Sequence, residues 1–136
     1  MSESPRQYAY LRITSTVIDP DRITQQTGLM PNQQWRVGEQ TPVVGRPAKF
    51  HHWQLDSGIE PSDDFHEHVA AVAGKVVGKE GAIRSLIEDC SVQLQIVRYL
   101  EGAADVGLSL SLREIDFLAR TGASLSVDDY DVGSDT

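Results

Sequence analysis

A stretch near the middle of the chain, residues 62–89, carries the longest helical repeat in the sequence. Its apolar side chains recur at steps of four, three and four residues, which is the spacing of one stripe along an α-helix. These residues are Phe65, Val69, Val72 and Val76. The segments around the stretch are short and alternate apolar with polar residues, as β-strands do. We therefore expect the helix to bury its stripe by covering one face of a sheet.

The same stretch contains signals for its start and for a break. Ser62 and the two acidic residues after it predict the helix N-terminus, because a hydroxyl caps the first backbone amides and carboxylates complement the helix dipole. Gly78 and Gly81 each cost a helix about 1 kcal/mol relative to alanine. We therefore expect a break between these glycines, with the helix in one or two pieces.

The rest of the chain divides into short regular segments. Strands are predicted where apolar and polar residues alternate, over residues 8–15, 34–39, 50–55, 92–97, 107–110 and 123–127. One short helix is predicted from the N-cap Asp19 to Gly28. Another is predicted from the capping box of Ser111 and Glu114 to Gly122. The apolar face expected for this last helix consists of Leu112, Ile115, Leu118 and Ala119.

The order of these elements is β-α-β-β-α-β followed by an extra β-α-β, and its first part is the ferredoxin-like split arrangement. Right-handed crossovers place the helices on one side of a shared sheet. We therefore predict a two-layer α+β fold, with the helices on one face of a mainly antiparallel sheet. The length of 136 residues predicts a single domain. Its ordered core is expected over about residues 7–130, with loose ends at 1–6 and in the acidic tail 131–136.

Charge and composition narrow the range of partners. The chain has a formal net charge of −8, and residues 54–136 hold six basic against sixteen acidic residues. Nucleic-acid binding depends on a basic surface, so we expect no nucleic-acid partner. The acidic excess favours a cationic partner or serves solubility. Residues 1–7 hold no apolar run, so we expect no signal peptide, no membrane association and a cytoplasmic location.

Few catalytic or metal-binding arrangements fit the sequence. Cys90 is the only cysteine, and we expect a small buried residue without disulfide or metal chemistry. His51 and His52 would point to opposite faces of a strand. His66 and His68 would diverge by about 200° on a helix, so neither pair chelates a metal alone. The alternative is a composite site that joins His52 to a carboxylate of another strand.

Motifs for nucleophilic catalysis and phosphate binding are also absent from the sequence. It contains no G-x-S-x-G elbow, no G-x-x-x-x-G-K-[ST] loop and no G-x-G-x-x-G turn. We therefore predict no catalytic residue, no metal and no cofactor.

Polar and aromatic side chains alternate with apolar ones on three predicted strands. They would lie together on the sheet face that the helices leave open. The candidate interaction face consists of Tyr8, Tyr10, Arg12, His52, Gln93 and Gln95, with Phe50 beside them. Tyrosine and arginine are enriched at interfaces, so this face is a candidate surface for a protein partner or a homodimer. The alternative is a face that loops merely shield.

The connection over residues 40–49 is a second candidate, and it holds two prolines and a glycine. Arg36, Arg46 and Lys49 lie in it or beside it and form the one locally cationic region of an acidic chain. This candidate anion loop could hold a negatively charged group. It lacks glycine-lined backbone donors, so the alternative is a solvated loop.

Five landmarks follow one another from Tyr8 to Tyr130. They are YAYLRI in the first strand, DPDRIT at the first helix, WRVGE over residues 35–39, WQLDSG over residues 53–58, and TGASLSVDDY over residues 121–130. In this order and spacing they resemble the bacterial domain-of-unknown-function 4279 family. The resemblance implies a small stand-alone α+β protein and attaches no activity to any residue. It also implies architectural tryptophans, in agreement with our interpretation of Trp35 and Trp53 as core anchors.

Size, charge and the missing catalytic motifs favour a non-enzymatic protein-interaction module. It would present the open sheet face or its acidic C-terminal half to a partner, and one version is an immunity-type protein that neutralises a basic toxin. The alternative is a small-molecule-binding protein or an enzyme. Its pocket would lie between the open face and residues 40–49 and would use Arg36, Arg46 or His52.

Overall fold

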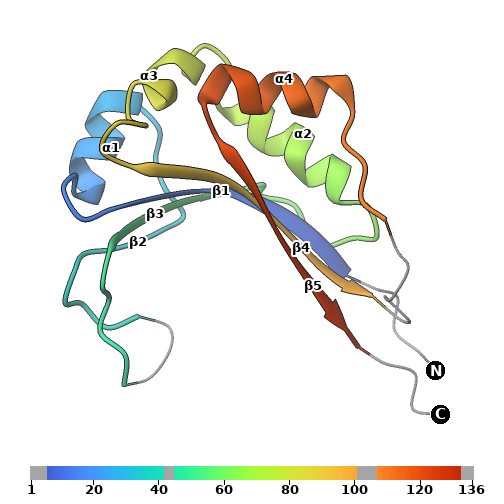
Figure 1. Cartoon of the computed structure of the whole chain (residues 1–136), viewed down its shortest axis with the longest axis horizontal. Helices are drawn as coiled ribbons and strands as arrows, with labels where there is room; N and C mark the ends of the chain where they lie inside the picture. Colours follow the sequence, from blue (N-terminus) through green and yellow to red (C-terminus); the bar gives the residue numbers. More distant parts are fainter. Residues whose placement is uncertain (1–5, 42–44, 101–106, 133–136) are drawn as a thin grey trace.

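The computed structural model of the chain describes residues 6–41, 45–100 and 107–132. In this part of the chain, five strands form one mixed sheet and four helices pack beside it (Figure 1). The strands are β1 (Arg6–Ser15), β2 (Gln33–Trp35), β3 (His51–Asp56), β4 (Ser91–Leu100) and β5 (Ser124–Asp131). The helices are α1 (Pro20–Thr27), α2 (Phe65–Lys75), α3 (Glu80–Arg84) and α4 (Leu112–Thr121). The predicted α+β class is confirmed.

The sheet has the strand order β2-β3-β1-β4-β5. The central strand β1 pairs antiparallel with β3 on one side and with β4 on the other, and β2 extends the sheet beyond β3. At the opposite edge β5 pairs parallel with β4, so that α4 forms the crossover between these two strands. The sheet is therefore mixed, with one parallel pair at its edge.

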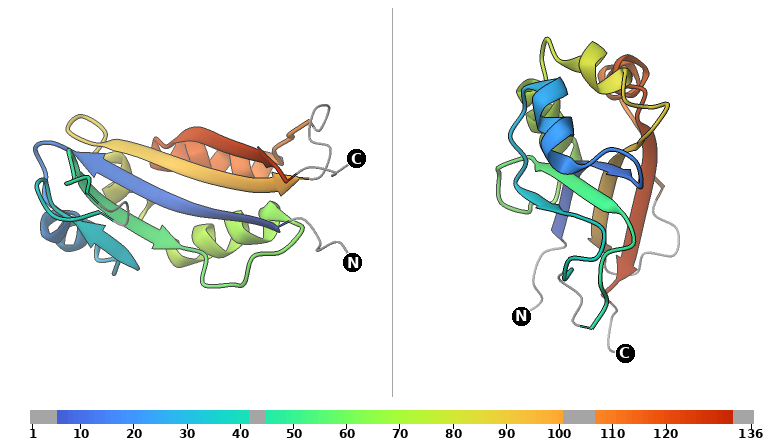
Figure 2. Two further views of the ribbon diagram at one scale, coloured as in Figure 1. Left: turned by 90° about the horizontal axis from the view of Figure 1, so that it is seen from below. Right: turned by 90° about the vertical axis from the view of Figure 1, so that its left-hand side faces the viewer.

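The helices all lie on one side of the sheet, and the connection between β2 and β3 extends from the other side (Figure 1). The two turned views in Figure 2 show the same separation of helices from the exposed sheet face. The molecule therefore has two layers, and one face of its sheet is left without helices. None of the helices in the described ranges is long and apolar enough to cross a membrane.

The first and last helices begin and end where the sequence predicts. The carboxylate of Asp19 accepts a hydrogen bond from a backbone N–H of the first turn of α1 at 3.1 Å. Gly28 ends this helix at a φ of 72°, a left-handed conformation that favours glycine. The capping box of Ser111 and Glu114 begins α4, and Gly122 ends it in the same left-handed conformation.

The central stretch forms two helices, α2 and α3. Gly78 lies between them at a φ of 83°, which confirms the predicted break at this glycine, whereas Gly81 lies inside α3. The predicted cap Ser62 is wrong: Asp64 caps α2, and its carboxylate accepts a backbone N–H at 2.9 Å. Ser62 instead forms an isolated bridge with Gln7, so the first turn of the helix begins two residues later than predicted.

The hydrophobic core lies between the helices and the covered sheet face. Its largest fully buried side chain is Trp53 of β3, whose indole N–H donates to the hydroxyl of Thr24 on α1 at 3.1 Å. The apolar stripe of the central stretch is buried against the sheet, and Cys90 is buried as predicted. The alternating core residues of the strands are Ala9, Leu11, Ile13, Leu55, Val92, Leu94 and Ile96. Period-two alternation therefore decides which strand residues enter the core.

The C-terminal part differs from the prediction. Residues 107–110 form no strand, so the extra β-α-β unit is instead the crossover from β4 through α4 to β5. Leu108 and Leu110 still pack against the core, which explains their apolar pattern. β5 continues past its predicted end at Val127 to Asp131, and β1 begins at Arg6, two residues before its predicted start. Residues 1–5 and 133–136 lie outside the described residues.

Candidate functional site

The strand register brings the whole candidate interaction face to the side of the sheet that the helices leave uncovered. We call this side the open face. It contains Tyr8, Tyr10 and Arg12 of β1, His52 of β3, and Gln93 and Gln95 of β4. Arg12 lies opposite Gln93 in the β1–β4 ladder, and Tyr10 lies opposite Gln95. Adjacent strands thus place these side chains next to one another.

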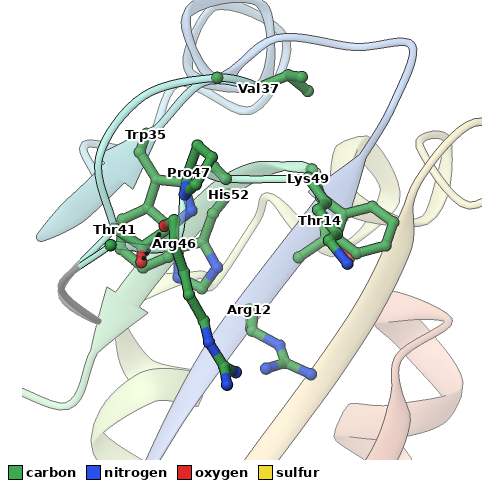
Figure 3. Close-up of a pocket in the computed structure, with 13 residues that line it drawn as sticks. Arg12, Thr14, Trp35, Val37, Thr41, Arg46, Pro47, Lys49 and His52 are labelled. Carbon is green, nitrogen blue, oxygen red and sulfur yellow. Dashed lines mark hydrogen bonds between the residues drawn. The ribbon is translucent and has the colours of Figure 1, made fainter.

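A concave pocket of about 780 Å³ lies on the open face, where the segment between β2 and β3 turns back over the sheet (Figure 3). The sheet contributes Arg12, Thr14, Trp35 and His52 to its lining, and the returning segment contributes residues 45–50. The alternative hypothesis from the sequence expected a pocket between these two parts of the chain.

Three cationic side chains, Arg12, Arg46 and Lys49, line this pocket, and its described lining residues include no aspartate or glutamate. Gln93 holds the guanidinium of Arg12: its Oε1 accepts from Nε at 3.1 Å and also from Nη2. This neutral partner orients the cation without cancelling its charge. The guanidinium groups of Arg12 and Arg46 extend in the same direction in Figure 3. The pocket is therefore electropositive, although the chain as a whole is acidic.

Arg36 does not line the pocket, although the sequence grouped it with Arg46 and Lys49. Its guanidinium contacts the carboxylate of Asp21 on α1 at 2.5 Å and lies 3.6 Å from that of Glu39. The candidate anion loop is thus divided: Arg46 and Lys49 face the pocket, whereas Arg36 connects the loop to α1.

The pocket has an aromatic wall. The rings of Trp35 and His52 stack with their centroids 4.0 Å apart and their planes at 7°. The prediction that Trp35 anchors the core is wrong, because Trp35 pairs with His52 in the β2–β3 ladder and shares its face. Phe50, which is 54% exposed, adds a third ring to the lining.

A chain of hydrogen bonds runs along the open side of β3. Nε2 of His52 lies 2.9 Å from Oε1 of Gln54, and Nε2 of Gln54 donates to Oδ1 of Asp56 at 2.7 Å. Burial lowers the pKa of His52 below its ordinary value, although the hydrogen bond to Gln54 opposes this effect. The imidazole is therefore neutral near pH 7.

The other end of the open face carries a tyrosine cluster, which consists of Tyr8, Tyr10, Tyr99 and Tyr130. The Tyr8 and Tyr10 rings stack with centroids 6.2 Å apart, and the Tyr99 and Tyr130 rings with centroids 5.0 Å apart. Burial, followed by the neighbouring tyrosines, raises the pKa of Tyr8 to about 12. The open face therefore has a cationic end at the pocket and an aromatic end at the tyrosine cluster.

The remaining histidines lie away from the pocket and apart from each other. Nδ1 of His66 contacts the carboxylate of Glu114 at 2.7 Å, which links α2 to α4. His68 is fully buried, and its Nδ1 lies 2.7 Å from the hydroxyl of Ser57. The predicted divergence of the two side chains is confirmed. Within the described residues, no group of three or more potential metal ligands comes together.

The comparison with known families extends over nearly the whole of this fold. The family model described as Domain of unknown function (DUF4279) matches residues 5–132. The chain belongs to this family. Searches of curated proteins and of solved structures found no match. The family name of DUF4279 assigns no activity, so the function of its members has to be argued from geometry.

The landmarks of this DUF4279 domain have different roles. Trp53 fills the core, and Gly58 turns the chain after β3 at a φ of 82°. Trp35 instead belongs to the pocket, as does Thr14, which the sequence did not single out. The signal that could have found Trp35 is the hairpin register, because an antiparallel partner of His52 must share its face.

Proposed function

We propose that this protein binds a small anionic molecule with a planar ring in the pocket of the open face. One observation carries the proposal: three cationic side chains line a pocket whose described lining has no acidic residue, in a chain of net charge −8. Solubility does not require such a cluster, and placing like charges together costs free energy unless an anion joins them.

The chemistry of the lining defines the ligand. Guanidinium groups bind carboxylate or phosphate oxygens through paired N–H donors, and Arg46 has no acidic partner among the described residues. The stacked rings of Trp35 and His52, with Phe50, offer flat apolar surface to a planar group. No nucleophile paired with a base occurs among the described lining residues, which supports binding rather than catalysis.

Replacing Arg46 should weaken this binding. We expect 2-naphthoate to bind the protein and its neutral isostere 2-naphthamide to bind at least about 10-fold more weakly, because only the carboxylate pairs with the guanidinium groups. Arg46→Ala should lower the affinity for 2-naphthoate by about 10-fold and leave the amide unaffected. Isothermal titration calorimetry measures all four affinities.

Arg36→Ala is the matched control, because it removes the same charge from a neighbouring arginine that faces Asp21 on α1. It should leave the affinity for 2-naphthoate unchanged. Equal losses in the two variants would indicate a general effect of net charge and would contradict the proposed site. Equal binding of acid and amide by the wild-type protein would do the same.

A protein partner at the tyrosine cluster is the second candidate function. Tyr130 is 48% exposed beside the stacked Tyr99, and partly exposed tyrosines are typical of protein interfaces. Light scattering should then give a dimer, or a lysate pull-down a partner, that is lost in Tyr130→Arg and retained in the control Arg36→Ala. A monomer at every concentration together with an empty pull-down would contradict this candidate.

We further propose the ferredoxin-like description for the first four strands and the helices between them. The element order β1-α1-β2-β3-α2-β4, with α3 as a continuation of α2, and the three antiparallel pairs support it. On this description β5 is an addition at the edge.

A further inference from the structure

His52 is held in one position at the wall of the pocket. It is 8% exposed, stacks on Trp35 and lies opposite Thr14 in the β1–β3 ladder. The imidazole ring is thus held by its stacking on Trp35, and its backbone is held by the pairing of β3 with β1. The remaining question is which of its two ring nitrogens carries the hydrogen.

The hydrogen-bond chain along β3 determines the tautomer of His52. The carboxylate of Asp56 can only accept, so the atom of Gln54 that lies 2.7 Å from it is the amide nitrogen. The amide oxygen of Gln54 therefore faces Nε2 of His52 at 2.9 Å, and Nε2 must carry the hydrogen. Because the ring is neutral, Nδ1 holds a lone pair and accepts hydrogen bonds.

This lone pair is available to the pocket. Nδ1 of His52 has no hydrogen-bond partner among the described residues, where no buried side-chain nitrogen or oxygen is left without one. Nδ1 is therefore not sealed inside the protein, and His52 lines the pocket beside three cationic side chains. A ligand that fills the pocket covers this acceptor and loses free energy unless it supplies a donor.

We infer that the pocket selects anionic planar ligands that also carry a hydrogen-bond donor, and that Nδ1 of His52 is the acceptor that recognises this donor. The class includes heteroaromatic carboxylates or phosphates with a ring N–H. Gln54 and Asp56 act as positioning residues that fix the tautomer of His52. This inference rests on the proposed function and assigns the specificity of the same site.

Two isosteric probes test it. Indole-2-carboxylate and benzofuran-2-carboxylate have the same charge and nearly the same shape, but only the indole carries a ring N–H. Calorimetry at pH 7.5 should give about 10-fold tighter binding for the indole, because the benzofuran leaves the acceptor unpaired. His52→Phe keeps a ring against Trp35 but lacks Nδ1, and it should reduce this ratio to about one while binding of the benzofuran persists.

Gln54→Met tests the positioning role separately. It frees Nε2 of His52, so the ring can exchange tautomers, and we expect a smaller ratio with unchanged affinity for the benzofuran. Equal binding of both probes by the wild-type protein would overturn the inference but leave the proposed anion site in place. If His52→Phe still bound the indole about 10-fold more tightly than the benzofuran, the acceptor would be a residue other than His52. Failure of 2-naphthoate and both probes to bind would overturn the proposed function itself.

Discussion

Replacing Trp53 by alanine should lower the free energy of unfolding by about 3 to 5 kcal/mol. Trp53 is fully buried in the core, and its indole N–H also holds α1 through Thr24. Truncation removes the largest fully buried side chain and leaves a cavity in the core. Urea denaturation followed by circular dichroism measures the change. If the alanine variant does not fold, Trp53→Phe should fold and unfold at a lower urea concentration than the wild-type protein.

Trp35→Ala is the matched control, because it makes the same substitution on the open face, where Trp35 pairs with His52. Trp35 stacks on His52 but is not buried in the core, so its loss should cost about 1 kcal/mol. The test is the difference between the two losses in free energy of unfolding, because both variants remove the same side chain. Similar costs for Trp53 and Trp35 would show that the hydrophobic core is not where the structure places it.

Asp129→Ala should lower the free energy of unfolding by about 3 kcal/mol, which is the low end for breaking a buried ion pair. Arg98 is 4% exposed, and its Nε and Nη2 donate to the two carboxylate oxygens of Asp129 at 2.7 Å each. Among the described residues, the substitution leaves the buried guanidinium with the carbonyl oxygen of Gly107 as its one remaining partner. The loss in free energy of unfolding should not be larger, because the Asp129 side chain is 37% exposed and the pair is therefore only partly buried.

A surface pair with similar geometry provides the comparison. Arg120 and Asp116 on α4 lie 2.6 Å apart, but both side chains are more than half exposed. Asp116→Ala should therefore leave the free energy of unfolding nearly unchanged, because water screens this exposed pair. Combining Asp129→Ala with Arg98→Met should recover part of the loss, since no unpaired charge then remains buried. A loss for Asp116→Ala as large as that for Asp129→Ala would contradict the role of burial.

The sequence predicts the strands better than the helix faces. Alternation on β1 placed Leu11 in the core and Arg12 on the open face, because a strand offers only two sides. A helix offers many, and on α4 the predicted apolar face is only partly correct. Leu118 packs against the core as expected, but Leu112 is 84% exposed and Ile115 50%, whereas Phe117 is buried. The capping box fixed where α4 begins, but its packing against α2 and α3 decides which side it buries.

Only one side of the pocket can be predicted from local sequence patterns. Its wall follows from alternation. Its other side exists because residues 38–40 lie beside residues 47–48, with backbone hydrogen bonds of 2.8 Å between Gly38 and Ala48 and between Ala48 and Glu39. Proximity in sequence grouped Arg36 with Arg46, yet Asp21, which lies fifteen residues earlier, turns Arg36 away. Such contacts between distant segments cannot be read from periodicity or composition.

The acidic C-terminal residues lie on the parallel strand β5, and this position gives them a second role. β5 forms an outer edge of the sheet, and most of its residues are exposed. An unpaired strand edge is a template for another chain, and proteins block such templates with charge. Asp128, Asp129 and Asp131 lie on this edge, so an incoming strand would meet a row of carboxylates. The residues that a composition count assigns to solubility thus protect the molecule against edge-to-edge aggregation.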